Sequence, residues 1–259
     1  MFDLDAYLER IGLRGRPSVT DVHRAHALAI PFENLDPRRG VPVSIDPDDL
    51  QRKLVTERRG GFCFEQNLLL SDALGALGCG VELLLARVRA NRPFDAGIRP
   101  RTHCALRITD RDGGIWHGDV GFGTGTPLRP LPFGAGEEHD IDGWGFRIVA
   151  EGDLLVMQGR DHLGEWGDLY SFEPAPVPRV DCELSSWYAS TWPRHPMVTG
   201  LIVAGNRPDG GRVSVSDWSG ELVLSEQDAG AAAVVEPLDE ADVPALVAQR
   251  FGLDDALLR

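Results

Sequence analysis

The chain has 259 residues, of which 42% are hydrophobic and 25% charged, and its formal net charge is −14. This size is typical of a globular protein with one large or two to three small domains. The acidic balance disfavours binding to nucleic acid or to an anionic membrane, because both need a basic face. No apolar run approaches the roughly 18 residues of a membrane span, and residues 1–5 lack the basic and apolar regions of a signal peptide.

The cysteines and the basic residues carry two further signals. Four cysteines stand at positions 63, 79, 104 and 182 without C-x-x-C spacing. We therefore expect free thiols in a reducing cytoplasm. Of the 26 basic residues only Lys53 is a lysine, so the other 25 are arginines. GC-rich coding in a bacterium explains this preference without any functional role.

The first eighty residues predict four helices. Ser18 or Thr20 can cap the second helix, and Pro31 ends it. Asp46 followed by Pro47 is a good start for the third. Apolar positions at helical spacing mark the first and fourth helices: Leu4, Leu8 and Ile11, and Leu70, Leu74 and Leu77. The third helix is expected over residues 48–56, and the fourth begins at Cys63.

From about residue 81 the pattern changes to short strands and turns. Short strands separated by turns are typical of an antiparallel barrel or sandwich. The expected strands are residues 81–88, 103–108 and 115–120, and turn signals stand at residues 112–114, 134–136 and 142–143. The proline-rich stretch 174–178 is typical of a stiff linker. Beyond it we expect a helix at 184–190, strands at 201–204, 212–215 and 221–224, and a closing helix at 240–251, with 231–235 unassigned.

Cys63 is the most informative residue of the chain. Gly60 and Gly61 allow a sharp turn just before it, and it opens a predicted helix. The positive end of the helix macrodipole and the charges of Arg58 and Arg59 are predicted to favour the thiolate, which is the nucleophilic form. The local sequence fits a small buried hydrophobic residue equally well.

A cysteine nucleophile needs a base and an acceptor that orients the base. His103 is the candidate base, and Cys104, on the opposite strand face, is expected to be a buried filler. Asp119 lies in an apolar, glycine-flanked strand end, where an unpaired carboxylate is costly. A hairpin turning at residues 112–114 would bring Asp119 near His103. The expected order is therefore Cys63, His103, Asp119.

Other histidines compete for the role of base. His117 shares a strand face with Asp119 and is the most credible rival. His23 and His26 are expected at surface positions of a helix. No H-x-x-x-H pattern, C-x-x-C pair or carboxylate cluster predicts a metal site.

Four blocks of this sequence are similar to the arylamine N-acetyltransferase family, in the family's order and approximate spacing. They are Arg59-Gly60-Gly61-Phe62-Cys63-Phe64-Glu65-Gln66-Asn67, Pro31-Phe32-Glu33-Asn34-Leu35, Thr102-His103 and Asp119-Val120-Gly121-Phe122-Gly123. The resemblance continues through residues 187–191, so it covers most of the chain.

The resemblance implies an α+β multi-domain fold with a cysteine protease-like core. A helical bundle over residues 1–80 would carry the nucleophile, and an antiparallel β-barrel over 81–180 would carry the histidine and the aspartate. An interdomain helical segment and an α/β lid would follow over 181–259. The resemblance also implies ping-pong acyl transfer, in which acetyl-CoA acetylates Cys63 and an arylamine or arylhydrazine then takes the acetyl group.

The resemblance assigns further residues to substrate and CoA. They are Phe32, Phe122 and Met197 for the acceptor pocket, and Gly123, Thr124 and Gly125 for a close approach of the backbone to CoA. Met197 lies in a segment where many members carry a serine and then a phenylalanine. Glu33 and Glu65 are predicted to be structural, since a carboxylate in the first turn of a helix is favourable without a catalytic role.

Three other functions compete with arylamine acetylation. An amide synthase of the same fold would close a macrolactam from a polyketide bound to a carrier protein. A cysteine hydrolase would use water as acceptor. A binding domain with an inactive triad is disfavoured, because all three triad positions are intact. The expected partners are small-molecule amines and a CoA thioester, without nucleic acid, membrane or metal, and the oligomeric state is open.

Overall fold

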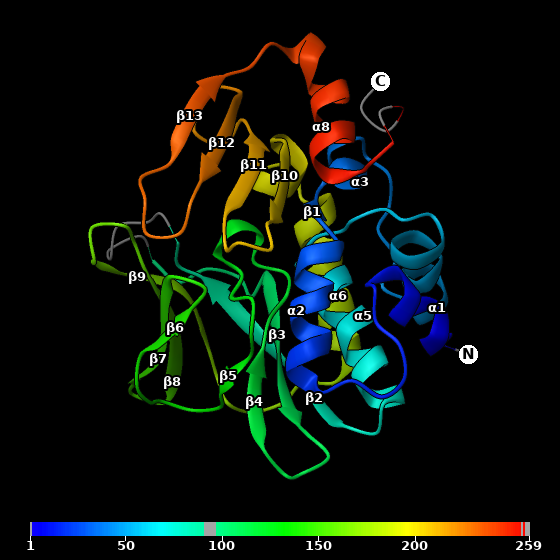
Figure 1. Cartoon of the computed structure of the whole chain (residues 1–259), viewed down its shortest axis with the longest axis vertical. Coiled ribbons are helices and arrows are strands. Elements are labelled where there is room, and N and C mark those ends of the chain that lie inside the picture. The colour runs from blue at the N-terminus through cyan, green and yellow to red at the C-terminus, as the bar shows by residue number, and fades with distance from the viewer. Residues whose placement is uncertain (1, 91–96, 255, 257–259) are drawn as a thin grey trace.

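The computed structural model describes residues 2–90, 97–254 and 256, and it combines two antiparallel sheets with a group of helices (Figure 1). Most of the helices gather on one side of the larger sheet, and the smaller sheet lies at one end of the molecule with the last helix beside it. This is the α+β arrangement that the sequence predicts. Within the described ranges, no helix has both the length and the apolar character needed to cross a bilayer.

The first eighty residues form helices where local signals predict them. Ser18 caps the second helix with a reciprocal bond to Asp21, and Asp46 caps the fourth, with Pro47 at its first position. The predicted helix over residues 48–56 is a short α-helix that continues as a π-helix. The bounds are α1 (Leu4–Arg10), α2 (Val19–Ala29), α3 (Leu35–Arg38), α4 (Pro47–Leu50), the π-helix η1 (Gln51–Thr56) and α5 (Cys63–Ala76).

Helix α5 lies inside the core. Every residue from its first, Cys63, to Leu70 is buried, so the helix is covered on all sides of its first two turns. Leu74 and Leu77 of the predicted apolar stripe are buried as well. The polar side chains in these turns must therefore find partners within the protein, because unpaired buried polar groups are costly.

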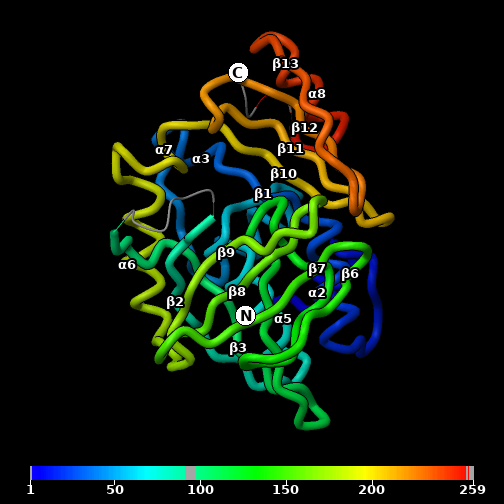
Figure 2. Tube along the Cα trace, turned by 90° about the vertical axis from the view of Figure 1, so that its left-hand side faces the viewer, coloured from blue at the N-terminus to red at the C-terminus, as the bar shows by residue number. Residues whose placement is uncertain are grey.

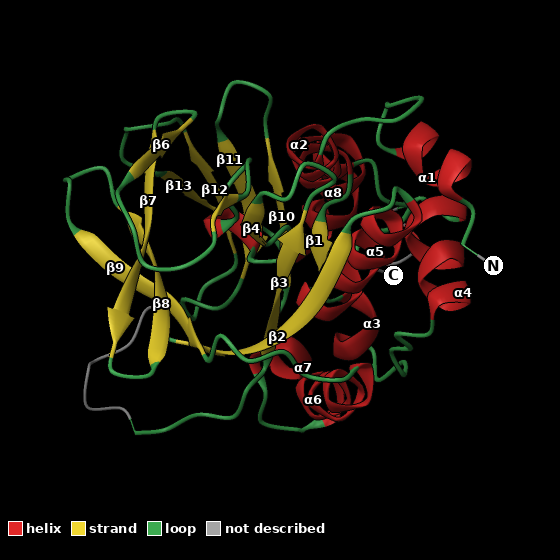
Figure 3. Ribbon diagram, turned by 90° about the horizontal axis from the view of Figure 1, so that it is seen from below, coloured by secondary structure: helices red, strands yellow, loops and turns green. Residues whose placement is uncertain are grey.

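The larger sheet has eight strands in the order β5-β4-β3-β2-β9-β8-β7-β6 and curves into a nearly closed barrel (Figure 3). The predicted turn at residues 112–114 joins β3 to β4. The strand expected over residues 115–120 ends at Gly118, two residues earlier than expected. The bounds are β2 (Gly80–Val88), β3 (His103–Thr109), β4 (Ile115–Gly118), β5 (Leu131–Pro132), β6 (His139–Ile141), β7 (Trp144–Glu151), β8 (Leu154–Arg160) and β9 (Trp166–Phe172).

The C-terminal part adds two helices, a second sheet and a closing helix. The unassigned residues 231–235 lead into a strand, and the predicted closing helix begins with a 3-10 turn. The bounds are α6 (Arg179–Thr191), α7 (Pro196–Thr199), β10 (Ile202–Asn206), β11 (Arg212–Ser216), β12 (Val223–Gln227), β13 (Val234–Pro237), η3 (Glu240–Asp242) and α8 (Val243–Phe251).

A short strand near the N-terminus completes the smaller sheet. β1 (Phe32–Glu33) lies beside β10 and pairs with it (Figure 2). In this pairing Phe32 lies opposite Ala204. Phe32 also forms a parallel bridge with Gly61, in the loop before α5. β1 thus joins the nucleophile's loop to the C-terminal sheet. The division into units at residues 80 and 180 stays a prediction.

Candidate active site

Cys63 is the first residue of α5, and the loop before it is tightly packed. A β-carbon on Gly60 would stand 2.2 Å from the carbonyl oxygen of Pro31, so only glycine fits there. Cys63 is 5% exposed. Its thiol donates a hydrogen bond of 3.5 Å to the carbonyl oxygen of Thr102. The sulfur therefore lies beside the peptide group that leads directly into His103.

His103 and Asp119 form a buried hydrogen-bonded pair. His103 opens β3, Asp119 follows β4, and His103 Nε2 lies 2.8 Å from Asp119 Oδ2. Burial alone would raise the pKa of Asp119, but His103 and two N–H donors outweigh it and lower the pKa to about 2. An ionised carboxylate can only accept hydrogen bonds. His103 Nε2 therefore carries the proton, and Nδ1 is the basic atom of the ring.

The other oxygen of Asp119 is tied to the helix that carries Cys63. Asp119 Oδ1 accepts from Asn67 Nδ2 at 2.8 Å and from the backbone N–H of Gly121 at 2.9 Å. Asn67 lies one helical turn beyond Cys63, and its own oxygen accepts from the backbone N–H of Val120. The side chain of Asn67 thus connects α5 to the segment that carries Asp119.

The segment after Asp119 also lies directly against α5. A β-carbon on Gly121 would stand 2.8 Å from Cys63 Cα and 2.9 Å from Asn67 Nδ2, so glycine is required for this approach. The structure therefore brings Cys63, His103 and Asp119 into one buried region. Their catalytic roles stay a prediction.

In the folded protein, Arg59 does not supply the free positive charge on which the predicted bias of Cys63 towards the thiolate partly depends. The guanidinium of Arg59 binds Glu33 and Asp36, at 2.7 Å each, so acidic partners balance its charge. Burial, and then the negative charge of Asp119, raise the pKa of the Cys63 thiol. A thiolate at this position therefore needs a positive charge nearby, which arises if the proton moves from the thiol to a neighbouring base.

His117, the rival base, is held by two aromatic side chains, one of which, Tyr170, also contacts the His103 ring with centroids 4.7 Å apart. Its Nε2 lies 2.7 Å from the hydroxyl of Tyr170, and its ring stacks on Phe172 with centroids 4.8 Å apart. Burial lowers the pKa of His117 to about 4. Of the two histidines, the structure gives the hydrogen bond with the Asp119 carboxylate to His103.

His23 and His26 are fully buried, so the expectation that they lie on the surface is wrong. The reason is that α2 packs against α5. His26 accepts from the hydroxyl of Tyr7 at 2.8 Å and donates to Gln66 Oε1 at 2.7 Å. His23 Nε2 accepts from the backbone N–H of Asp119 at 3.1 Å. Sequence reasoning missed these supporting residues, since their partners are distant in the chain.

The three predicted pocket residues lie on segments around this region. The ring of Phe122 meets the His103 ring edge-on, with centroids 5.0 Å apart. Phe32 is buried in β1, and Met197 is half-buried in α7. Asn34 Nδ2 donates to the carbonyl oxygen of Met197 at 2.9 Å, which connects the segment after β1 to α7. Only Phe122 has a ring contact with the His103 side chain among these three.

The predicted CoA residues form the 3-10 turn η2 (Gly123–Gly125), directly after Phe122. Gly123 has a φ of 59°, in the left-handed region that favours glycine. A β-carbon on Gly125 would stand 2.6 Å from the Phe122 ring. The local structure therefore explains why glycine stands at both positions. No group of three histidine, cysteine or acidic residues in the described part of the chain could hold a metal ion.

The predicted filler Cys104 is fully buried, and all four cysteines are free. Cys104 lies beside Cys182, which contributes, ahead of burial, to raising the pKa of Cys104. This arrangement agrees with a packing role for Cys104.

Comparisons with known proteins agree on one family. A family model described as N-acetyltransferase matches residues 17–256. An arylamine N-acetyltransferase of Mycobacterium bovis is 38% identical over 263 residues, covering 98% of this chain and 90% of that protein. The solved structure of the M. smegmatis arylamine N-acetyltransferase superposes with a TM-score of 0.92 at 36% identity, covering 100% of this chain and 98% of that one. The M. marinum enzyme in complex with CoA also gives 0.92 at 36% identity, covering 99% and 95%. The chain is thus an acetyltransferase and belongs to the arylamine N-acetyltransferase family.

Proposed function

We propose that this enzyme transfers the acetyl group of acetyl-CoA to the nitrogen of an arylamine or arylhydrazine through a thioester on Cys63. The observation that carries the proposal is the buried His103–Asp119 pair, together with a Cys63 thiol that contacts the carbonyl oxygen of Thr102, the residue before His103. The names of the relatives support the acceptor class, and the CoA complex of the M. marinum relative supports the donor.

The first half-reaction begins with proton transfer from Cys63 to His103 Nδ1. Because burial and Asp119 raise the pKa of the thiol, the thiolate forms together with an imidazolium that offsets its charge. Asp119 holds the ring and stabilises that imidazolium. The thiolate attacks the thioester carbonyl of acetyl-CoA, the bond to the CoA sulfur breaks, and CoA leaves with the proton from His103.

The second half-reaction returns the enzyme to its starting state. The amine nitrogen attacks the acetyl carbonyl on Cys63, and His103 takes the proton that the nitrogen loses. The bond between the acetyl carbon and Cys63 breaks, and the sulfur regains the proton from His103. The donor and the acceptor therefore react in turn at one sulfur, which predicts ping-pong kinetics.

We propose that the CoA thioester end approaches the turn η2. Gly123 is buried in this turn, and a β-carbon on it would lie 4.0 Å from Ala204 and from Phe32. Phe32 is one of those neighbours, and Phe122 precedes the turn. We propose that these two rings and Met197 line the acceptor pocket, next to the backbone of residues 123–125.

A two-step transfer experiment tests the proposal. The protein is incubated with acetyl-CoA, freed of donor by rapid gel filtration, and then mixed with an arylamine. We expect one N-acetylated amine per loaded enzyme. Product that forms only while acetyl-CoA is present would contradict the thioester route.

The donor and the acceptor are then varied to separate the alternative functions. Malonyl-CoA and longer acyl-CoAs test the acyl length. Loading only from an acyl carrier protein would support the amide synthase, and release of free acetate at the same rate with and without amine would support the hydrolase.

A further inference from the structure

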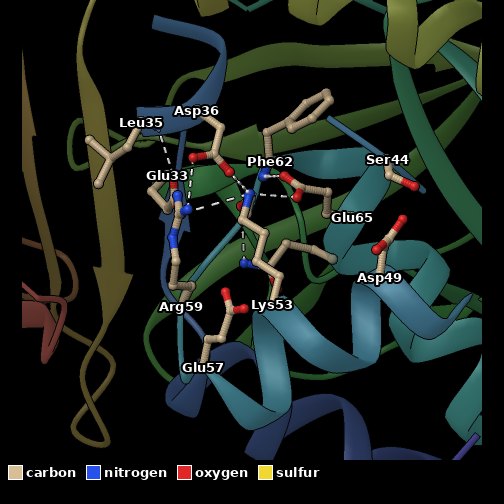
Figure 4. Close-up of polar contacts among 12 residues, drawn as sticks. Glu33, Leu35, Asp36, Ser44, Asp49, Lys53, Glu57, Arg59, Phe62 and Glu65 are labelled. Carbon is tan, nitrogen blue, oxygen red and sulfur yellow. Dashed lines mark hydrogen bonds and ion pairs between the residues drawn. The ribbon is translucent and has the colours of Figure 1, made fainter. Parts of the chain in front are cut away.

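Lys53 lies at the centre of a buried group of charges (Figure 4). It projects from η1, and its ammonium contacts Glu65 Oε1 at 2.6 Å and Asp36 Oδ2 at 2.7 Å. Glu33 Oε1 stands 4.0 Å away. Arg59 completes the group by binding Glu33 and Asp36. We call these five residues the Lys53 cluster.

The Lys53 cluster reaches the first turn of the nucleophile's helix. Glu65 is 1% exposed, and its Oε2 accepts from the backbone N–H of Phe62 at 3.0 Å, immediately before Cys63. The carboxylate that caps α5 is therefore the one that Lys53 holds. The negative charge of Glu65 is also one of the factors that raise the pKa of the Cys63 thiol, so the charge of Lys53 opposes this effect.

The same ammonium connects α5 to the segment formed by β1 and α3. Asp36 belongs to α3, which follows β1 and Phe32. Glu33, within β1, accepts from the backbone N–H of Leu35 through its second oxygen. Lys53 thus bridges the cap of the Cys63 helix and the segment that carries a predicted pocket residue.

The residue type at position 53 also needs an explanation. The chain uses arginine at its 25 other basic positions, so composition alone predicts arginine here. An ammonium is a compact charge with three donors, whereas a guanidinium is a planar fork. Two carboxylates at contact distance and a third at 4.0 Å converge on one point, which suits the ammonium.

We propose that Lys53 is a positioning residue for Cys63: its ammonium fixes the Glu65 carboxylate that caps α5 and offsets the charge of that carboxylate near the sulfur. This inference rests on the proposed function, in which Cys63 is the acylated nucleophile. Lys53 acts through Glu65 and does not touch the reacting atoms.

Alkylation of Cys63 tests the proposal without using acetyl transfer. The rate of its reaction with iodoacetamide is measured against pH, with peptide mapping to separate Cys63 from the other cysteines. In Lys53→Gln we expect the midpoint to move to higher pH, with a rate about tenfold lower near pH 8, because one pKa unit changes the thiolate fraction tenfold. Arg52→Gln removes the same charge from the exposed neighbouring position and is expected to leave the profile unchanged.

Lys53→Arg separates charge from shape. We expect this variant to restore much of the alkylation profile, because arginine restores the positive charge. We do not expect it to restore kcat, because the planar guanidinium does not fit among the three carboxylates. An unchanged alkylation profile in folded Lys53→Gln would overturn the proposal. If Cys63→Ala keeps transfer activity, the proposed function fails, whereas a shifted alkylation profile in Lys53→Gln would still place Lys53 in control of the sulfur.

A spectroscopic measurement on the unmodified sequence covers the case in which Lys53→Gln does not fold. Because the chain has one lysine, labelling with ¹⁵N-lysine gives a single side-chain ammonium resonance. We expect this resonance to shift when iodoacetamide alkylates Cys63 and to move strongly in Glu65→Gln. A resonance that ignores both changes would refute the link between Lys53 and Cys63.

Discussion

Gly121 lies so close to Cys63 that a β-carbon on it would stand 2.8 Å from Cys63 Cα. The neighbouring atom is backbone of a buried helix, which cannot move aside as a flexible side chain would. Through this contact the position of Cys63 depends on the segment that holds Asp119. The nucleophile and the carboxylate, 56 positions apart in sequence, are thereby held in one arrangement.

Gly121→Ala is expected to push this segment away from α5. We predict a loss of about 1–3 kcal/mol in the free energy of unfolding, as for other overpacked sites, and a large fall in kcat. Denaturant unfolding and steady-state kinetics measure the two effects. Gly75→Ala is the control on the same helix, because a β-carbon there meets nothing within 4 Å. If the two variants had the same free energy of unfolding and the same kcat, the contact between Gly121 and Cys63 would not constrain the site.

Asp119→Asn is expected to lower kcat by about 10³–10⁴-fold while the protein stays folded, by analogy with the orienting aspartate of serine triads. An amide can donate to His103 Nε2, which would favour the wrong tautomer and remove the basic Nδ1. Steady-state kinetics together with circular dichroism check this prediction. A fall of less than tenfold would mean that Asp119 does not orient the base.

The two strand histidines should respond differently to the same substitution. His103→Gln is expected to abolish transfer, because it removes the base that Asp119 holds. His117→Gln should mainly affect stability, since His117 contacts Tyr170 and Phe172. Activity per folded molecule distinguishes the two. Loss of transfer in His117→Gln with activity kept in His103→Gln would reverse the assignment of the base.

Glu65 gives the protein a specific dependence of stability on pH. Burial raises its pKa to about 7 against the opposing charge of Lys53, so the folded protein keeps this proton to higher pH than the unfolded chain, and the carboxylate that Lys53 offsets is mostly ionised only above about pH 7. The stabilising contribution is complete below the unfolded pKa of about 4.3 and is lost as pH rises through about 7.

Glu65→Gln is neutral at every pH and serves as the reference. The unfolding free energy of the wild type minus that of the variant should therefore fall between pH 4.5 and pH 8, as measured by urea unfolding. A difference that stays constant over this range would show that Glu65 does not titrate there.

Local signals predicted the parts of the fold that are decided locally. The Asp46–Pro47 start of α4 and the glycine turn between β3 and β4 each depend on neighbours in sequence. The pairing of His103 with Asp119 followed from that hairpin. These contacts could be predicted because turn residues and strand alternation determine the register.

Long-range contacts explain what sequence reasoning missed. β1 pairs with β10, which lies about 170 positions later in the chain. A strand of two residues carries no local sequence signal that identifies such a distant partner. The sequence predicts surface positions for His23 and His26, yet both are buried in the core, where they form hydrogen bonds with Asp119 and Gln66. The charge of Arg59 was predicted to act on Cys63, but acidic residues from β1 and α3 bind it instead.

The mass of the intact protein after brief exposure to acetyl-CoA shows whether Cys63 carries the acetyl group. We expect the wild type to gain the mass of a single acetyl group, peptide mapping to place it on Cys63, and an arylamine to remove it. Cys63→Ala should gain nothing. An acetyl group that still appears on Cys63→Ala, or a wild type that acetylates arylamines without ever carrying one, would show that transfer does not pass through a thioester on Cys63.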